Sequence, residues 1–147
     1  MSRIRLTKEF TFEMAHMLEG YDGPCKNVHG HSYRLAVTVI GEPNANPADP
    51  KYGMVMDFGQ LKSIVTKKVV NRFDHVLMVK GNNQILKQPN IQSLGNIEQV
   101  DYQPTCENLL IHIVQLISAE LPKEVKLHHL KLHETATSFA EWFASDN

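Results

Sequence analysis

The feature that most constrains the fold is an alternation of apolar and polar side chains near the start of the chain. The apolar residues that share one parity there are Ile4, Leu6, Phe10, Phe12 and Met14. Polar and charged residues occupy the other parity, and Lys8 breaks the pattern. Because alternate side chains of a strand point to opposite faces, this segment predicts a β-strand with one face toward a core.

A second alternating segment begins at His29, after residues 19–24, in which glycine, aspartate and proline favour a loop. The side chains that share the parity of His29 are His31, Tyr33, Leu35, Val37 and Val39. His16 continues the apolar parity of the first segment. If the two predicted strands are neighbours, their inward faces bring all three histidines together beyond the core.

Two later segments predict helices. Asp57 is a typical N-cap residue, and apolar side chains follow it at helical spacing up to a predicted end near residues 71–74. These apolar residues are Phe58, Leu61, Ile64, Val65, Val69 and Phe73. Thr105 is a candidate cap for a second helix, which Pro122 is expected to end.

The remaining segments complete the prediction of the fold. Residues 79–103 are rich in asparagine, glutamine and glycine and predict a long loop. Residues 125–134 and 138–143 predict two more strands. The order strand, strand, helix, helix, strand, strand predicts a single α+β domain over residues 1–147, with a four-stranded antiparallel sheet and two helices on one face. Because such a sheet has two exposed edges, we expect a homo-oligomer.

Bulk composition excludes several classes of partner. The chain has 147 residues and a net charge of −1, without the basic excess of a protein that binds nucleic acid or an anionic membrane. No apolar run approaches the roughly 20 residues that span a bilayer. No secretory signal is visible, so the cytoplasm is the expected location. With two distant cysteines, Cys25 and Cys106, a disulfide framework is not expected.

The segment from Cys25 to His31 carries the strongest indication of chemistry. His29 and His31 lie two residues apart, so an extended backbone places both imidazoles on one face. With His16 they form a three-nitrogen set, and catalytic zinc sites use three protein ligands and leave one position open. A thiol near a cation ionises more readily, which makes Cys25 a candidate base. A His-x-His pair alone is also common among structural histidines.

Three other positions have both a chemical and a structural interpretation. Asp74 could orient His75 as an acid–base group, or His75 could interact with a helix C-terminus. Glu134 continues the apolar parity of its strand. Its carboxylate could accept hydrogen bonds from the amino-amidine edge of a planar heterocycle, or it could lie exposed at the strand end. Glu107 lies in the first turn of the second helix, where an acid complements the helix dipole, and a role in binding a ligand would depend on the residues around it.

With these residues in place, the chain resembles the family of the 6-pyruvoyl-tetrahydropterin and 6-carboxy-tetrahydropterin synthases. The resemblance extends over nearly the whole chain. The motifs that carry it are Phe12-Glu13-Met14-Ala15-His16, Cys25 to His31, Met56-Asp57-Phe58, Phe73-Asp74-His75, Pro104 to Asn108 and His133-Glu134-Thr135. Six motifs in the same order are specific, whereas any one of them alone is not.

The resemblance implies the tunnelling fold, in which subunits join their sheets into a barrel, commonly as a hexamer of two stacked trimers. It implies 7,8-dihydroneopterin triphosphate as the small-molecule substrate. By motif, the Zn²⁺ ligands are His16, His29 and His31. Cys25 corresponds to the catalytic cysteine, with Asp74 and His75 as its relay. The substrate-binding residues are Glu134, which binds the pterin ring, and Thr105 and Glu107, which line its pocket.

The short spacing between Cys25 and His29 resembles the 6-carboxy-tetrahydropterin synthases of queuosine biosynthesis, which release acetaldehyde and triphosphate. A 6-pyruvoyl-tetrahydropterin synthase acting on the same substrate is one alternative, and a non-catalytic module that binds zinc or pterin is another. Two departures from the family bear on substrate choice. The connection over residues 76–103 is longer than in compact bacterial relatives, and Cys106 stands where a small non-thiol residue is more frequent.

Overall fold

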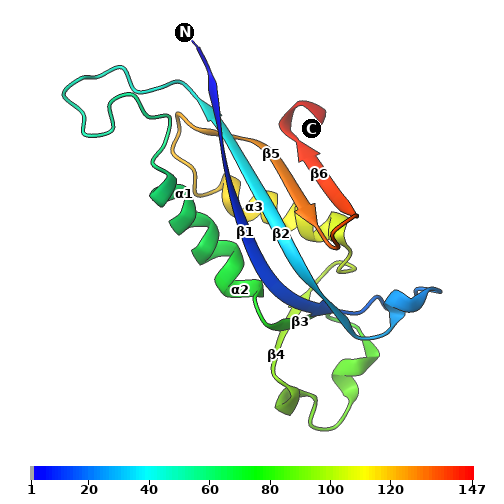
Figure 1. Ribbon diagram of the computed structural model, residues 1–147. Coiled ribbons are helices and arrows are strands. Elements are labelled where there is room, and N and C mark those ends of the chain that lie inside the picture. The colour runs from blue at the N-terminus through cyan, green and yellow to red at the C-terminus, as the bar shows by residue number, and fades with distance from the viewer. Residues whose placement is uncertain (1) are drawn as a thin grey trace.

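A six-stranded mixed sheet forms the centre of the computed structural model, which describes residues 2–147 (Figure 1). The strands are β1 (Ile4–His16), β2 (His29–Gly41), β3 (Val76–Lys80), β4 (Asn96–Val100), β5 (Lys126–His133) and β6 (Phe139–Phe143). Their order across the sheet is β4-β3-β1-β2-β5-β6. The strands predicted from sequence, β1, β2, β5 and β6, are antiparallel neighbours, whereas β3 pairs parallel with β1 and with β4.

The prediction of a four-stranded sheet was therefore wrong, because residues 79–103 are not a simple loop. They hold the end of β3, two 3₁₀ turns (Gln84–Lys87 and Ile91–Leu94) and β4. β4 has the sequence Asn-Ile-Glu-Gln-Val, which carries too few β-formers to predict a strand. Its backbone pairs with β3, which in turn pairs with the edge of β1, and such long-range pairing leaves little trace in local sequence.

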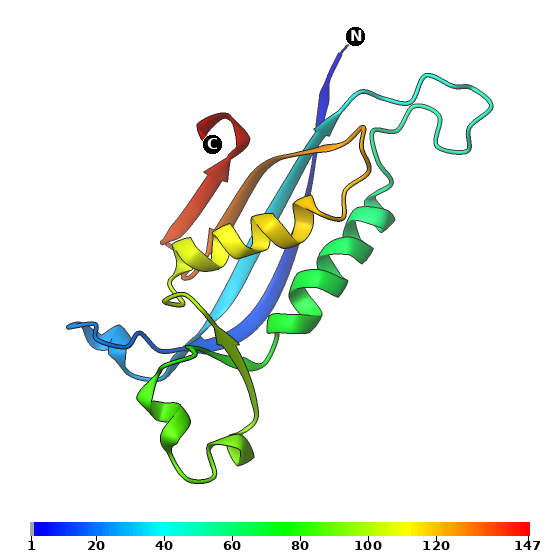
Figure 2. The same cartoon turned by 180° about the vertical axis from the view of Figure 1, so that it is seen from behind.

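Both helical segments cover the same face of the sheet, as predicted (Figure 2). α1 (Phe58–Val65) begins after Asp57, whose side chain accepts the Gly59 N–H, and it continues through a π-helical turn into α2 (Asn71–Phe73). α3 (Cys106–Ser118) is capped by Thr105, whose side chain accepts the Asn108 N–H. Within residues 2–147, none of the helices has the length and apolarity needed to cross a bilayer.

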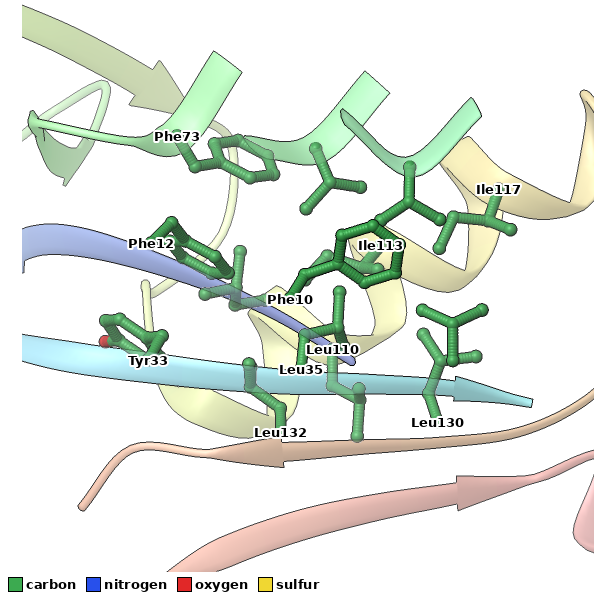
Figure 3. Packing of buried hydrophobic residues seen from close by; sticks show 14 of the residues in the cluster. Phe10, Phe12, Tyr33, Leu35, Phe73, Leu110, Ile113, Ile117, Leu130 and Leu132 are labelled. Atoms are coloured by element: carbon green, nitrogen blue, oxygen red, sulfur yellow. The ribbon is translucent and has the colours of Figure 1, made fainter. Parts of the chain in front are cut away.

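The core lies between this sheet face and the helices (Figure 3). The inward residues are buried from Phe10 to His16 on β1 and from Tyr33 to Val39 on β2, which confirms the parity inferred from the alternation, whereas Ile4 at the start of β1 is exposed. Phe12 and Tyr33 stack against each other, and Phe73 of α2 packs over Phe12. On the inward face, Tyr33 is the next residue after His31 on β2, and Met14 separates Phe12 from His16 on β1. This aromatic layer therefore supports the end of the sheet from which the histidine side chains project.

Candidate active site

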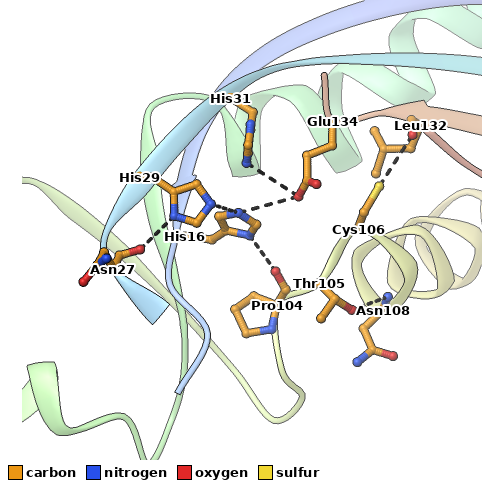
Figure 4. Close-up of polar contacts among 10 residues, drawn as sticks. All are labelled: His16, Asn27, His29, His31, Pro104, Thr105, Cys106, Asn108, Leu132 and Glu134. Carbon is orange, nitrogen blue, oxygen red and sulfur yellow. Dashed lines mark hydrogen bonds and ion pairs between the residues drawn. The ribbon is translucent and has the colours of Figure 1, made fainter. Parts of the chain in front are cut away.

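Three histidines from two neighbouring strands meet at the end of the core (Figure 4). The antiparallel register of β1 and β2 pairs His16 with His29 and Met14 with His31. One ring nitrogen from each histidine lies within 4.8 Å of the others. His16 is almost fully buried, with 1% of its surface exposed. The structure thus places together the three residues that the sequence predicts as a metal-ligand set.

Backbone carbonyls fix the orientation of two of these rings. His16 Nδ1 lies 2.7 Å from the Pro104 carbonyl oxygen, and His29 Nδ1 lies 2.7 Å from the Asn27 carbonyl oxygen. A carbonyl oxygen only accepts hydrogen bonds, so each Nδ1 carries the proton and donates it. In the neutral rings both Nε2 atoms then present a lone pair, and they face each other across 2.9 Å. Such a pair of acceptors favours a cation between them.

The donor set fits a divalent metal ion. His31 Nε2 is buried and has no hydrogen-bond partner in the part of the chain that the structure describes. Three imidazole nitrogens suit Zn²⁺, and the carbonyl contacts of His16 and His29 are the outer hydrogen bonds that orient metal-binding histidines. Glu134 Oε1 lies 3.6 Å from Nε2 of both His16 and His31, so the Glu134 carboxylate lies directly beside the histidine cluster.

The metal-free protein is expected to lose stability as the pH falls below about 6.5. Burial lowers the pKa of His16 and of His31 from the ordinary value of 6.5. The unfolded chain therefore binds protons first as the pH falls, which favours unfolding. The same protons compete with a metal for the imidazoles. Thermal melts across about pH 5 to 8 test this. This expectation would be contradicted if neither the melting temperature nor the rise in melting temperature on adding metal changed with pH.

Cys25 lies on one side of the histidine cluster. It belongs to a short 3₁₀ turn, Pro24–Lys26, and the Cys25 carbonyl accepts the Leu18 N–H at 2.9 Å. The Cys25 cavity, as we call it, has a volume of about 360 Å³. Its walls include Cys25, His16, Thr105, Glu107 and Glu134. The structure therefore groups the predicted cysteine and all three predicted substrate-binding residues around one cavity beside the metal-ligand set.

Asp74 and His75 lie together, but they do not line the Cys25 cavity. His75 Nδ1 is 3.0 Å from Asp74 Oδ2, and His75 is 76% exposed. His75 contributes to a second cavity of about 550 Å³, the His75 cavity, together with His31, Val28 and Leu94. His31 borders this second cavity, whereas His16 borders the first. The two cavities therefore adjoin different members of the histidine cluster.

The backbone of His75 is held in an unusual conformation. Its φ of 62° is in the left-handed region, which is costly for a residue with a side chain and is found disproportionately at functional sites. The backbone of Glu13 on β1 makes two hydrogen bonds to the Asp74-His75 segment. Its carbonyl accepts the His75 N–H at 2.6 Å, and its N–H donates to Asp74 Oδ1 at 2.8 Å. The bond from Glu13 holds the pKa of the Asp74 carboxyl below its ordinary value.

Several supporting groups were not predicted from sequence. The carbonyls of Asn27 and Pro104 orient the histidines, and Glu13 orients the Asp74-His75 segment. Carbonyl groups occur in every residue, so residue type gives no indication of such roles. Tyr33 shares the parity of His29 and His31, and this pattern could have identified it as a neighbour of the cluster.

Comparisons with known proteins identify the family of the chain. The sequence profile described as 6-pyruvoyl tetrahydropterin synthase matches residues 5–144. The chain belongs to the 6-pyruvoyl tetrahydropterin synthase family. This confirms the resemblance seen in the motifs. Relatives of this family are named as synthases, which supports an enzyme that acts on a small pterin molecule.

Individual relatives cover nearly the full chain. The 6-carboxy-5,6,7,8-tetrahydropterin synthase of Haemophilus influenzae is 34% identical over 145 residues, covering 94% of this chain and 97% of the relative. The protein of the same name from Synechocystis is 35% identical over 138 residues, with 93% and 91% covered. The solved 6-pyruvoyl tetrahydropterin synthase of Caenorhabditis elegans has a TM-score of 0.69 at 23% identity, covering 98% of this chain and 97% of that one. This structural likeness supports the α+β fold class.

Proposed function

We propose that the protein is a zinc-dependent lyase that converts 7,8-dihydroneopterin triphosphate and one water molecule to 6-carboxy-5,6,7,8-tetrahydropterin, acetaldehyde and triphosphate. The observation that carries this proposal is the cluster of three imidazoles beside a cavity lined by Cys25 and Glu134. The names of the relatives from Haemophilus influenzae and Synechocystis support the 6-carboxy product. The short spacing between Cys25 and His29 points to the same activity.

In the proposed mechanism, His16, His29 and His31 would hold the zinc ion. When bound there, zinc supplies Lewis-acid polarisation of the substrate's side-chain oxygens, which makes the neighbouring carbons more acidic. The Glu134 carboxylate accepts hydrogen bonds from the amino-amidine edge of the pterin and so fixes the ring at the cavity. Thr105 and Glu107 line the same cavity. Cys25 exchanges a proton with the substrate side chain, and His75, oriented by Asp74, exchanges a proton from the other side.

We also propose that the protein works as a homo-oligomer, in the arrangement of two stacked trimers that the family resemblance implies. Val28 is 51% exposed and Leu94 is 78% exposed, and both lie at the His75 cavity. An exposed apolar wall of this kind is typical of a surface that a partner covers. The Asp74-His75 pair would then act at a subunit boundary. Light scattering should give a mass of about six chains, and a monomer at working concentration would contradict this assignment.

The direct test of function is incubation of the zinc-loaded protein with 7,8-dihydroneopterin triphosphate, followed by mass analysis of the pterin and assay of acetaldehyde. We expect the 6-carboxy product together with acetaldehyde. A 6-pyruvoyl product without acetaldehyde would instead assign the protein to the other activity of its family. Unchanged substrate from fully loaded protein would contradict both enzymatic assignments.

A further inference from the structure

Tyr33 carries a buried hydroxyl that the mechanism above does not use. The residue is 1% exposed, and its hydroxyl oxygen has no hydrogen-bond partner within residues 2–147. An unpaired polar atom in a protein interior is costly, and phenylalanine would fill the same space without that cost. A polar group that lowers stability and lies at a candidate active site is a candidate for a functional role.

The surrounding packing leaves the Tyr33 ring little freedom. Phe12 is its direct partner across β1 and β2, and the two rings stack with centroids 5.1 Å apart and an interplanar angle of 8°. On another side Tyr33 meets the edges of the metal-ligand rings, with centroid distances of 5.6 Å to His31 and 6.3 Å to His16. The tyrosine ring is therefore fixed between the hydrophobic core and the histidine cluster.

The register of the sheet identifies the group that the hydroxyl can reach. The pairing of β2 with β5 ends at Arg34 and His133, and Glu134 follows His133 directly, so the same register extended by one residue brings Glu134 opposite Tyr33. Directly opposed residues of antiparallel strands share a face, with Cβ atoms about 4.5 to 5.5 Å apart. A tyrosine phenol has an ordinary pKa of about 10, so the Tyr33 hydroxyl carries a proton that it can donate to a carboxylate.

We propose that Tyr33 is a positioning residue whose hydroxyl donates a hydrogen bond to the Glu134 carboxylate in the pterin-bound protein. This inference rests on the proposed function, in which Glu134 binds the pterin ring. Glu134 Oε1 now lies 3.6 Å from the Nε2 atoms of His16 and His31 (Figure 4). A bond from Tyr33 would fix the orientation of this carboxylate toward the heterocycle. A carboxylate has about four lone-pair sites, so this bond leaves sites for the heterocycle.

The test compares two substitutions that each remove one tyrosine hydroxyl. Tyr33→Phe should weaken the binding of 7,8-dihydroneopterin to the zinc-loaded protein about tenfold, as measured by calorimetry, without lowering the melting temperature. Tyr102→Phe is the matched control, because the Tyr102 hydroxyl lies outside the site and bonds His112 Nδ1 at 2.7 Å. That control should lower the melting temperature and leave the affinity unchanged. A Tyr33→Phe protein with unchanged affinity would overturn the inference.

A double-mutant cycle with Glu134→Ala, which removes the acceptor, tests whether Tyr33 acts through the carboxylate. If it does, Tyr33→Phe should cost much less affinity in the Glu134→Ala background than in the native protein. An equal loss in both backgrounds would overturn the inference, since Tyr33 would then act independently of Glu134. Failure of the proposed function is a different result: the native zinc-loaded protein would bind no pterin at all, and the inference would fall with it.

Discussion

Replacing His31 with alanine is expected to weaken zinc binding by at least about 100-fold and to abolish turnover. Loss of an outer hydrogen bond to a metal ligand already costs about 10- to 100-fold in affinity, and removal of a ligand should cost more. His31 is the suitable position because its Nε2 has no hydrogen-bond partner within the described chain, so the substitution breaks no hydrogen bond. Zinc affinity measured by competition with a chelator gives the result directly.

The matched control for this substitution is His133→Ala. His133 lies on β5 opposite Arg34, so it faces the side of the sheet away from the histidine cluster. Zinc affinity and turnover should be unchanged in this variant, which separates loss of a ligand from a general effect of removing an imidazole. A His31→Ala protein that kept native zinc affinity would show that the three rings do not form the metal site.

Replacing Cys25 with alanine is expected to lower kcat by about 10²- to 10⁴-fold, the range of a general acid–base group, while zinc stays bound. Cys25 lies in the cavity that His16 and Glu134 also line, but it is not among the three residues that converge on the metal position. Chemistry and metal retention should therefore separate in this variant. Turnover and zinc content measured on the same preparation test the separation.

Cys106→Ala provides the control within the same cavity. The Cys106 thiol donates to the Leu132 carbonyl at 3.5 Å, and burial raises the pKa of this thiol to about 12, so it stays protonated at neutral pH. Its removal should change kcat little. If Cys25→Ala and Cys106→Ala were equally active, the proton-transfer role of Cys25 would be wrong, and a module that binds zinc or pterin without catalysis would be favoured.

The parts of the fold and site that follow from local pattern could be predicted from the sequence. Alternation in β1 and β2 predicted two half-buried strands, and the parity of His16, His29 and His31 predicted their shared face. Asp57 and Thr105 were correctly identified as helix caps because capping depends on residue type next to the helix start.

The parts that depend on distant pairing could not be predicted in this way. β3 and β4 form by parallel pairing beyond the edge of β1, so the expected long loop contributes instead to the sheet and to the wall of the His75 cavity. Adjacency of Asp74 and His75 was visible in the sequence, but the left-handed backbone of His75 was not. Nor could local pattern show that Cys25 and His75 would line separate cavities in one chain.

The most direct measurement is anomalous X-ray diffraction on crystals grown with zinc, recorded on both sides of the zinc absorption edge. We expect one strong anomalous peak about 2.0 to 2.1 Å from Nε2 of His16, His29 and His31, with a further position open toward the Cys25 cavity. A peak at another site, or no peak at the three imidazoles in protein that is active, would contradict this expectation.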